Sequence, residues 1–192
     1  MRSITVWTLF VGLVATACPA WSQEPPKTAL PASPGSPLVA YQRTVYDGVK
    51  GVLLRSAEKM PEESYGFRPV DSVRTFGQIL GHVAASQYFF CSTALGEKSP
   101  APKADPTKTS KADAVQGLKA AFAYCDAAWG RLDGASANEV VKLMGADAPR
   151  LGVLSVNSLH SVEHYGNLVT YMRMNGLVPP TSEPEFQPGA KK

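Results

Sequence analysis

The fold is decided by residues 151–175, whose sequence is LGVLSVNSLHSVEHYGNLVTYMRMN. Apolar residues recur in this stretch at steps of three and four, which is the period of an amphipathic α-helix. Gly176 suits the position just past the end of such a helix, and Pro179 and Pro180 prevent its continuation. The pattern therefore predicts one long helix near the end of the chain.

Two earlier segments show the same helical period. The first carries, at steps of three and four, the apolar residues Leu38, Tyr41, Val45, Val49, Val52 and Leu53. Pro61 ends this helix. The second can be capped by Asp71 or Ser72. Its expected apolar face consists of Val73, Phe76, Ile79, Leu80, Val83 and Phe90.

A further helix is predicted to begin near Ser110, with Asp113 three residues on. Its apolar residues are Leu118, Phe122 and Trp129. The polar stretch 96–109, GEKSPAPKADPTKT, precedes it and is long for a connection between helices. Residues 134–150 are expected to be irregular, with one short helix at 139–144, and no segment alternates with period two. Four helices with one long connection predict an all-α fold, a four-helix bundle.

The amino terminus has the features of a secretory signal peptide over residues 1–22. Arg2 supplies a positive charge, and residues 4–18 are apolar or small. Ala20 and Ser22 then place small residues at positions −3 and −1 of a cut that would follow Ser22. We therefore expect a periplasmic or secreted protein, with no stable membrane insertion after cleavage.

Two alternatives to a cleaved signal peptide stay open. An uncleaved membrane anchor needs about 20 apolar residues, which this stretch only just provides. Lipidation at Cys18 would instead make a lipoprotein, although Ala15 stands three residues before it where Leu is usual.

The mature chain divides into a linker, a domain and a tail. Residues 23–37 hold five prolines and are typical of an extended linker. Residues 178–192, VPPTSEPEFQPGAKK, resemble the linker in composition and are predicted to be a C-terminal tail. Residues 38–177 lie between them and are enough for one well-packed helical domain.

Composition excludes several classes of function. The chain of 192 residues is 44% hydrophobic and 18% charged, as is ordinary for a globular protein. Its net charge of +3 comes from scattered basic residues, so no nucleic-acid partner is expected. Nucleotide-binding and serine-hydrolase motifs are absent from the sequence, and no other cofactor site is indicated. The sequence does not set the oligomeric state and is compatible with a homodimer.

The cysteines do not form a zinc motif. Three cysteines without Cys-x-x-Cys spacing exclude a zinc ribbon or finger. Loss of a signal peptide would leave Cys91 and Cys125. In an oxidising compartment these two could pair, or they could remain two buried thiols, and their spacing does not decide between the two.

The three histidines have a spacing that suits one metal ion. His160 and His164 are four residues apart, so on a helix their rings lie on one side, one turn apart. His82 lies beside the apolar face of the second helix, where neighbouring helices of a bundle meet. Three neutral imidazoles leave a fourth position for water, as in catalytic metal sites. The alternative is a chance pair together with a histidine at the edge of the core.

Residues close to the histidine pair limit the classes of metal site that the sequence allows. Glu163 points away from the histidine pair, so the zinc-protease motif is not present. Asn157, one turn before His160, could orient a metal ligand or a bound water, or it could face solvent. No general acid or base is identifiable, so catalytic residues stay unassigned. Imidazole ligands suit zinc, nickel or iron, and the identity of the divalent metal ion is open.

Two stretches resemble the signature regions of the DinB-like superfamily, bacterial four-helix bundles related to the DNA-damage-inducible protein DinB. They are residues 60–91, MPEESYGFRPVDSVRTFGQILGHVAASQYFFC, and residues 160–182, HSVEHYGNLVTYMRMNGLVPPTS. The resemblance covers about residues 37–182 and implies a long crossing between helices two and three. It also implies that one histidine of helix two and two of helix four bind a divalent metal. The matching positions are His82, His160 and His164.

The resemblance also implies classes of function. Characterised members include thiol-dependent transferases and isomerases, in which the metal activates a low-molecular-weight thiol. We therefore expect a metal-dependent transferase or hydrolase that acts on a small-molecule substrate not identified by the sequence. Export departs from this pattern, because such thiols belong mainly to the cytosol. The alternative is a metal- or ligand-binding module without turnover. An open pocket beside the metal favours the enzyme, and a sealed site favours the module.

Overall fold

The computed structural model describes residues 35–100 and 110–186. Its α-helices are α1 (Pro37–Lys59), α2 (Phe76–Leu95), α3 (Lys111–Gly130) and α4 (Arg150–Met174). Two strands and four short 3₁₀ helices accompany them: β1 (Val140–Leu143), β2 (Ala146–Pro149), η1 (Glu62–Ser64), η2 (Ser136–Asn138), η3 (Pro180–Ser182) and η4 (Pro184–Phe186). The predicted all-α four-helix bundle is confirmed. None of the helices in these ranges is long and apolar enough to cross a membrane. The predicted signal peptide, residues 1–22, lies outside the described residues.

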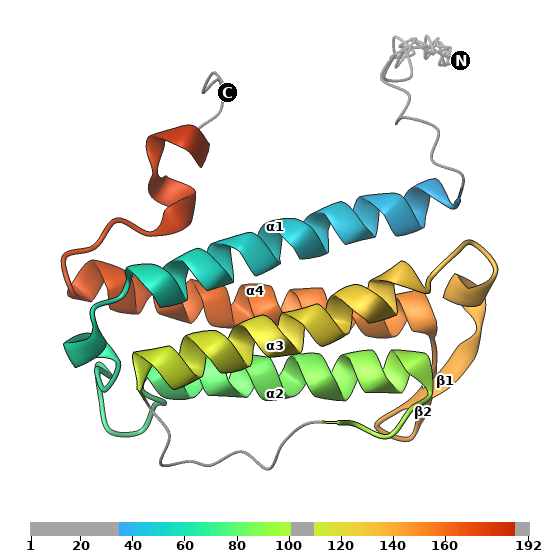
Figure 1. Cartoon of the computed structure of the whole chain (residues 1–192), viewed down its shortest axis with the longest axis horizontal. Helices are drawn as coiled ribbons and strands as arrows, with labels where there is room; N and C mark the ends of the chain where they lie inside the picture. The colour runs from blue at the N-terminus through green and yellow to red at the C-terminus, as the bar shows by residue number, and fades with distance from the viewer. Residues whose placement is uncertain (1–34, 101–109, 187–192) are drawn as a thin grey trace, which may run out of the picture. The chain divides into compact units, whose positions relative to one another are not determined.

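The helices pack in a ring in which each contacts two neighbours. α2 packs against α3 and α4, and α1 packs against the same two helices. α1 and α4 run in one direction, and α2 and α3 run in the opposite direction (Figure 1). Because α2 and α3 point the same way, the chain must return along the bundle between Leu95 and Lys111. This return accounts for the long connection.

Reciprocal hydrogen bonds fix the start of α2. The Thr75 hydroxyl accepts a hydrogen bond from the backbone N–H of Gln78 at 3.2 Å, and the Gln78 side chain accepts one from the Thr75 N–H at 2.9 Å. This capping box satisfies two N–H groups that the helix cannot pair itself. The predicted caps Asp71 and Ser72 are therefore wrong, and Val73, expected in the core, is exposed. The predicted start of α3 is confirmed, because Ser110 accepts from the Asp113 N–H.

The short helix predicted at residues 139–144 is wrong. This stretch holds β1, which pairs with β2 in an antiparallel hairpin that aligns Val140 with Pro149 and Leu143 with Ala146. Met144 and Gly145 form the turn with φ angles of 50° and 88°, the left-handed values that a two-residue hairpin turn favours. β1 alternates only between exposed and half-buried positions, so its period-two pattern is weak in the sequence.

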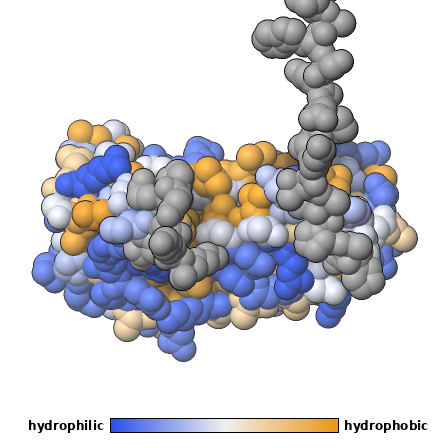
Figure 2. Space-filling view, turned by 90° about the horizontal axis from the view of Figure 1, so that it is seen from above, coloured by the Kyte–Doolittle hydropathy of each residue, from blue (hydrophilic) through white to orange (hydrophobic). Residues whose placement is uncertain are grey.

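The first half of α1 turns a different face to the core than its apolar pattern predicts, whereas Val52 and Leu53 are buried as expected. The buried residues of α1 include Val39, Tyr46 and Leu53, each seven positions from the next. The Tyr46 hydroxyl donates a hydrogen bond to the Asp126 carboxylate of α3 at 2.9 Å, which fixes the rotation of the helix. As a result Leu38, Tyr41 and Val45, which were expected in the core, are exposed. The view onto the side that carries α1 shows apolar residues at the surface among hydrophilic ones (Figure 2).

Part of the segment predicted as a tail packs on the bundle. The Glu183 carboxylate pairs with Arg55 and with Lys59, both on α1. The Tyr165 hydroxyl shares a hydrogen bond with the Thr181 hydroxyl at 2.9 Å. These contacts join the chain that follows α4 to both α1 and α4.

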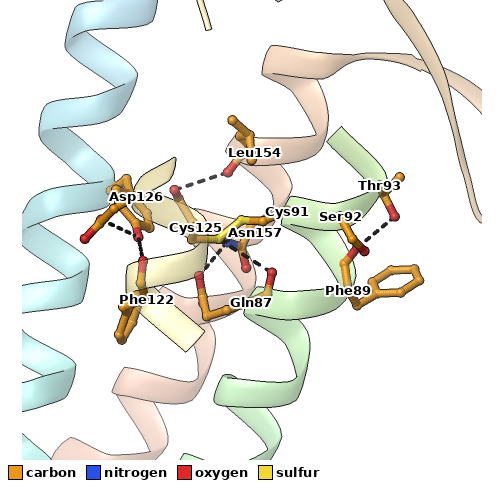
Figure 3. Close-up of a disulfide and its surroundings, with 12 residues drawn as sticks. Gln87, Phe89, Cys91, Ser92, Thr93, Phe122, Cys125, Asp126, Leu154 and Asn157 are labelled. Carbon is orange, nitrogen blue, oxygen red and sulfur yellow. Dashed lines mark hydrogen bonds between the residues drawn. A yellow bond between two sulfur atoms is a disulfide. The ribbon is translucent and has the colours of Figure 1, made fainter. Parts of the chain in front are cut away.

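A disulfide joins α2 to α3 in the core. Cys91 and Cys125 are both fully buried, and their Cα atoms lie 5.4 Å apart (Figure 3). Asn157 of α4 lies beside the bridge and donates a hydrogen bond to the Gln87 side chain of α2 at 2.7 Å. Gln87 in turn donates to the Ser161 hydroxyl of α4 at 2.9 Å. The disulfide and this buried polar network therefore connect three of the four helices.

Reduction of the disulfide is expected to lower the melting temperature markedly. The two cysteines are separated by 34 positions, and closing a loop of that length stabilises a protein by about 4 kcal/mol through the unfolded chain. For a domain of this size that corresponds to roughly 10 °C in Tm. Thermal unfolding with and without dithiothreitol measures the change. The Cys91→Ala/Cys125→Ala variant should not respond to the reductant. An unchanged Tm after complete release of two thiols would contradict the prediction.

Candidate metal centre

The packing of α2 on α4 brings the three predicted histidines together. His82 lies in the middle of α2, and His160 and His164 lie one turn apart on α4. The Nε2 atom of His160 is 3.1 Å from the Nε2 atom of His82 and 3.1 Å from that of His164. Each residue thus offers one nitrogen to a common point, and the cluster could hold a metal ion.

The inclination of the rings fits a shared centre. The ring planes of His160 and His82 meet at 61°, those of His82 and His164 at 89°, and those of His160 and His164 at 77°. Tetrahedral coordination with metal–nitrogen distances near 2.1 Å places ligand nitrogens roughly 3.4 Å apart. The two separations from Nε2 of His160, both 3.1 Å, are close to that value, and all three ligand atoms lie within 4.8 Å of one another. Three imidazoles are also a donor set that zinc, nickel and iron accept.

Hydrogen bonds within the described chain do not give every ring nitrogen of the three histidines a suitable partner. A neutral imidazole has one N–H donor and one acceptor nitrogen, so the Nε2 of His160 cannot pair well with two other Nε2 atoms at once. The Nδ1 atoms of His160 and His164 are also buried and have no hydrogen-bond partner within residues 35–100 and 110–186. Unsatisfied buried polar atoms are rare in folded proteins and are often found at functional sites. The donor atoms present therefore fit a cation.

Burial favours the neutral form of all three rings. It lowers the pKa of His82 to about 4, and it is the largest cause of the lowered pKa values of His160 and His164. The positive charge of Arg74 lowers all three pKa values further, and the negative charge of Glu163 raises them. Because a metal binds the neutral imidazole, little proton release opposes binding at neutral pH.

A cleft of about 560 Å³ reaches the cluster at His164. Its other polar lining residues are Ser72, Arg74, Gln78, Asn167 and Tyr171. Val73 and Ile79 supply an apolar part of the wall. The cleft is within the usual size range of small-molecule sites.

Helical spacing could have revealed several of these lining residues. Asn167 and Tyr171 follow His164 by three and seven positions, which places them on the same side of α4. Gln78 precedes His82 by four positions on α2. From the sequence, Asn157 and Glu163 are the neighbours singled out beside the histidine pair, whereas the cleft is lined by Gln78, Asn167 and Tyr171.

Asn157 and Glu163, the two residues close to the histidine pair in the sequence, do not line the cleft. Asn157 is fully buried beside the disulfide, so it neither faces solvent nor contacts the histidines. Glu163 is exposed and does not line the cleft, as its position on the helix predicted. Phe90 packs against the ring of His160, with 5.8 Å between ring centres.

The metal-free protein is expected to lose stability as the pH falls from 7 to 5. The pKa of His82 is about 4 in the folded protein and about 6.5 in an unfolded chain. Between these values the unfolded state binds more protons, so a lower pH favours unfolding. Thermal unfolding of chelator-treated protein at both pH values measures the loss. His82→Gln should reduce the loss by about 2–4 °C. Equal losses in the two proteins would show that His82 titrates normally.

Comparison with known proteins identifies the family. The family model of the DinB superfamily matches residues 46–168. A DinB-like protein from Bacillus cereus has a TM-score of 0.63 and 18% sequence identity, and the match covers 72% of this chain and 93% of that one. A DinB-like protein from Bacillus subtilis has a TM-score of 0.58 and 19% identity, with 73% and 92% covered. A search of curated proteins found no match.

These solved structures are less than 20% identical to this chain and support the fold alone. The family match is stronger evidence, because it extends over more than half of the chain and includes all three histidines. From its sequence match and its helical architecture, this protein belongs to the DinB superfamily.

Proposed function

We propose that this protein is a metal-dependent enzyme that binds one divalent ion through His82, His160 and His164 and acts on a small molecule. The observation that carries the proposal is the convergence of three Nε2 atoms beside a cleft that reaches His164. A structural metal site is normally closed by four protein ligands, whereas three ligands and an adjoining cleft are typical of catalytic sites.

Within this proposal, the reaction is that of a transferase or a hydrolase, in which a metal ion and polar groups of the cleft act on one small molecule. A divalent ion bound by the three histidines would supply Lewis-acid chemistry. The imidazoles would hold that ion at one end of the cleft, while Gln78, Asn167 and Tyr171 offer hydrogen bonds to a substrate. Phe90 packs against the His160 ring. The metal is zinc, nickel or iron, the ions that this donor set suits.

A metal- or ligand-binding module without turnover is the second candidate. It is favoured by the absence, among the residues that line the cleft, of any carboxylate or of a second histidine that could act as a general base. Turnover of candidate substrates by metal-loaded protein would exclude it.

Replacing His164 by Ala is expected to abolish stoichiometric metal binding. The change leaves two ligands and opens the site to water, and the helices should still fold because their apolar core is intact. Elemental analysis and circular dichroism of the purified variant measure both properties. Glu163→Gln is the matched control on the adjacent position, and it should retain one ion per chain. A triple variant of all three histidines that still holds one tightly bound divalent ion would overturn the metal assignment.

We also propose that the protein is exported to the periplasm or the medium. The signal-peptide pattern of residues 1–22 supports this proposal. The buried disulfide supports it as well, because disulfides persist in oxidising compartments. Export implies a substrate available outside the cytosol.

Mass spectrometry of the protein from its native compartment should give a mature chain that starts at Gln23. The measurement separates the three possibilities at the amino terminus. A chain that begins with a lipid-modified Cys18 would show a lipoprotein. An intact Met1, or recovery of the protein from the cytoplasm, would contradict export.

A further inference from the structure

The cleft beside the histidines contains one formally charged side chain, that of Arg74. The other lining residues are neutral, and no Asp or Glu is among them. Glu163, which is exposed on α4, is the acidic residue whose charge raises the pKa values of the three histidines, whereas the charge of Arg74 lowers them. The influence of Arg74 is the greater of the two on His82, and that of Glu163 is the greater on His160 and His164, but Glu163 does not line the cleft. The walls of the cleft therefore attract a negatively charged ligand.

The Arg74 guanidinium has no partner within the part of the chain that the structure describes. Five other arginines there pair with carboxylates: Arg43, Arg55, Arg68, Arg131 and Arg150. Arg173 donates a hydrogen bond to the Ser182 hydroxyl. Arg74 makes neither type of contact, so its five N–H donors are available to a ligand.

The backbone of Arg74 is held in place although its side chain is free. The Tyr171 hydroxyl donates a hydrogen bond to the Arg74 carbonyl at 3.0 Å. Tyr171 is itself buried and packs edge-to-face on Phe67, with 5.7 Å between ring centres. On the other side, Thr75 and Gln78 form the capping box that starts α2. The guanidinium is thus mounted on an ordered segment, which limits the entropy lost when it binds an anion.

Arg74 lines the same cleft as His164, the one histidine of the cluster that the cleft reaches. His164 in turn has its Nε2 atom 3.1 Å from that of His160, so the cleft adjoins the cluster. The charge of Arg74 also acts on all three rings. A small molecule could therefore contact the guanidinium with one group and reach the histidines with another.

We propose that Arg74 binds an oxyanion of the substrate, a carboxylate or a phosphate, in the cleft beside the three histidines. The planar guanidinium can donate two parallel hydrogen bonds to either group. The inference rests on the proposed function, because it assigns the class of molecule that the same site takes. It makes Arg74 a binding residue, and a small anion its ligand.

The test is calorimetric titration of the full chain with inorganic phosphate and with succinate, in zinc-loaded and in metal-free form. In the metal-free form, Arg74→Gln should weaken binding of the preferred anion about 10- to 100-fold, because charge-assisted bidentate hydrogen bonds are lost. Arg74→Lys keeps the charge without the planar fork and should be intermediate. Phosphate and succinate distinguish the two sources of the oxyanion by which of them loses more affinity.

Arg68→Gln is the matched control, since Arg68 lies on the same segment, pairs with Asp71 and does not line the cleft. It should bind both anions as the wild type does. Equal affinities of the wild type and Arg74→Gln, or no binding of either anion at millimolar concentrations, would overturn the proposal. Metal content is measured in parallel. Arg74-dependent anion binding by a wild type that holds no stoichiometric metal would reject the proposed metalloenzyme and keep the anion site.

Discussion

The relative position of α2 and α4 is the constraint on which the rest of the structure depends. One stretch of their interface pairs Gln87 with Asn157 and Ser161 by buried hydrogen bonds. The next turns of the same interface bring His82 to His160. A shift of α4 by one turn, about 5.4 Å, would break both sets of contacts together. Buried polar groups that lose their partners are costly, so the network fixes the register that the histidine cluster requires.

Local spacing determined what the sequence could predict. His160 and His164 share a side of α4 because residues four apart on a helix always do, and no tertiary knowledge is needed to see this. Their approach to His82 needs the packing of two helices, and the resemblance to a known bundle supplied it. Val52 and Leu53 of α1 are buried as predicted, but the core face of its first half could not be predicted, because apolar residues at steps of three and four are compatible with two overlapping faces of the helix. The choice depends on the contact of Tyr46 with α3. The position of the Arg74 side chain at the cleft could not be predicted either, because Arg74 lies in the turn before α2 and helical spacing does not apply there.

Buried polar atoms without a hydrogen-bond partner occur in the described chain both at the site and in the core. In the core, Gln87 has partners on both ends of its side-chain amide, whereas Oδ1 of Asn157 and Nε1 of Trp129 have none. In the cluster, His160 and His164 have Nδ1 atoms without partners in the described chain, and burial disfavours protonation of the rings. Functional sites commonly contain polar groups whose burial lowers the stability of the fold, and stable packing elsewhere offsets this loss. The covalent bridge in the neighbouring part of the core is a strong source of that stability.

The position of the disulfide also determines what happens when the backbone is cut. Cys91 lies near the end of α2 and Cys125 within α3, so the covalent ring closed by the bridge contains the entire connection between Leu95 and Lys111. A protease that cleaves anywhere in this connection produces two fragments that remain one molecule. The amino-terminal fragment then keeps His82 and the carboxy-terminal fragment keeps the other two histidines. A nicked chain thus retains all three side chains of the cluster in one covalently linked molecule.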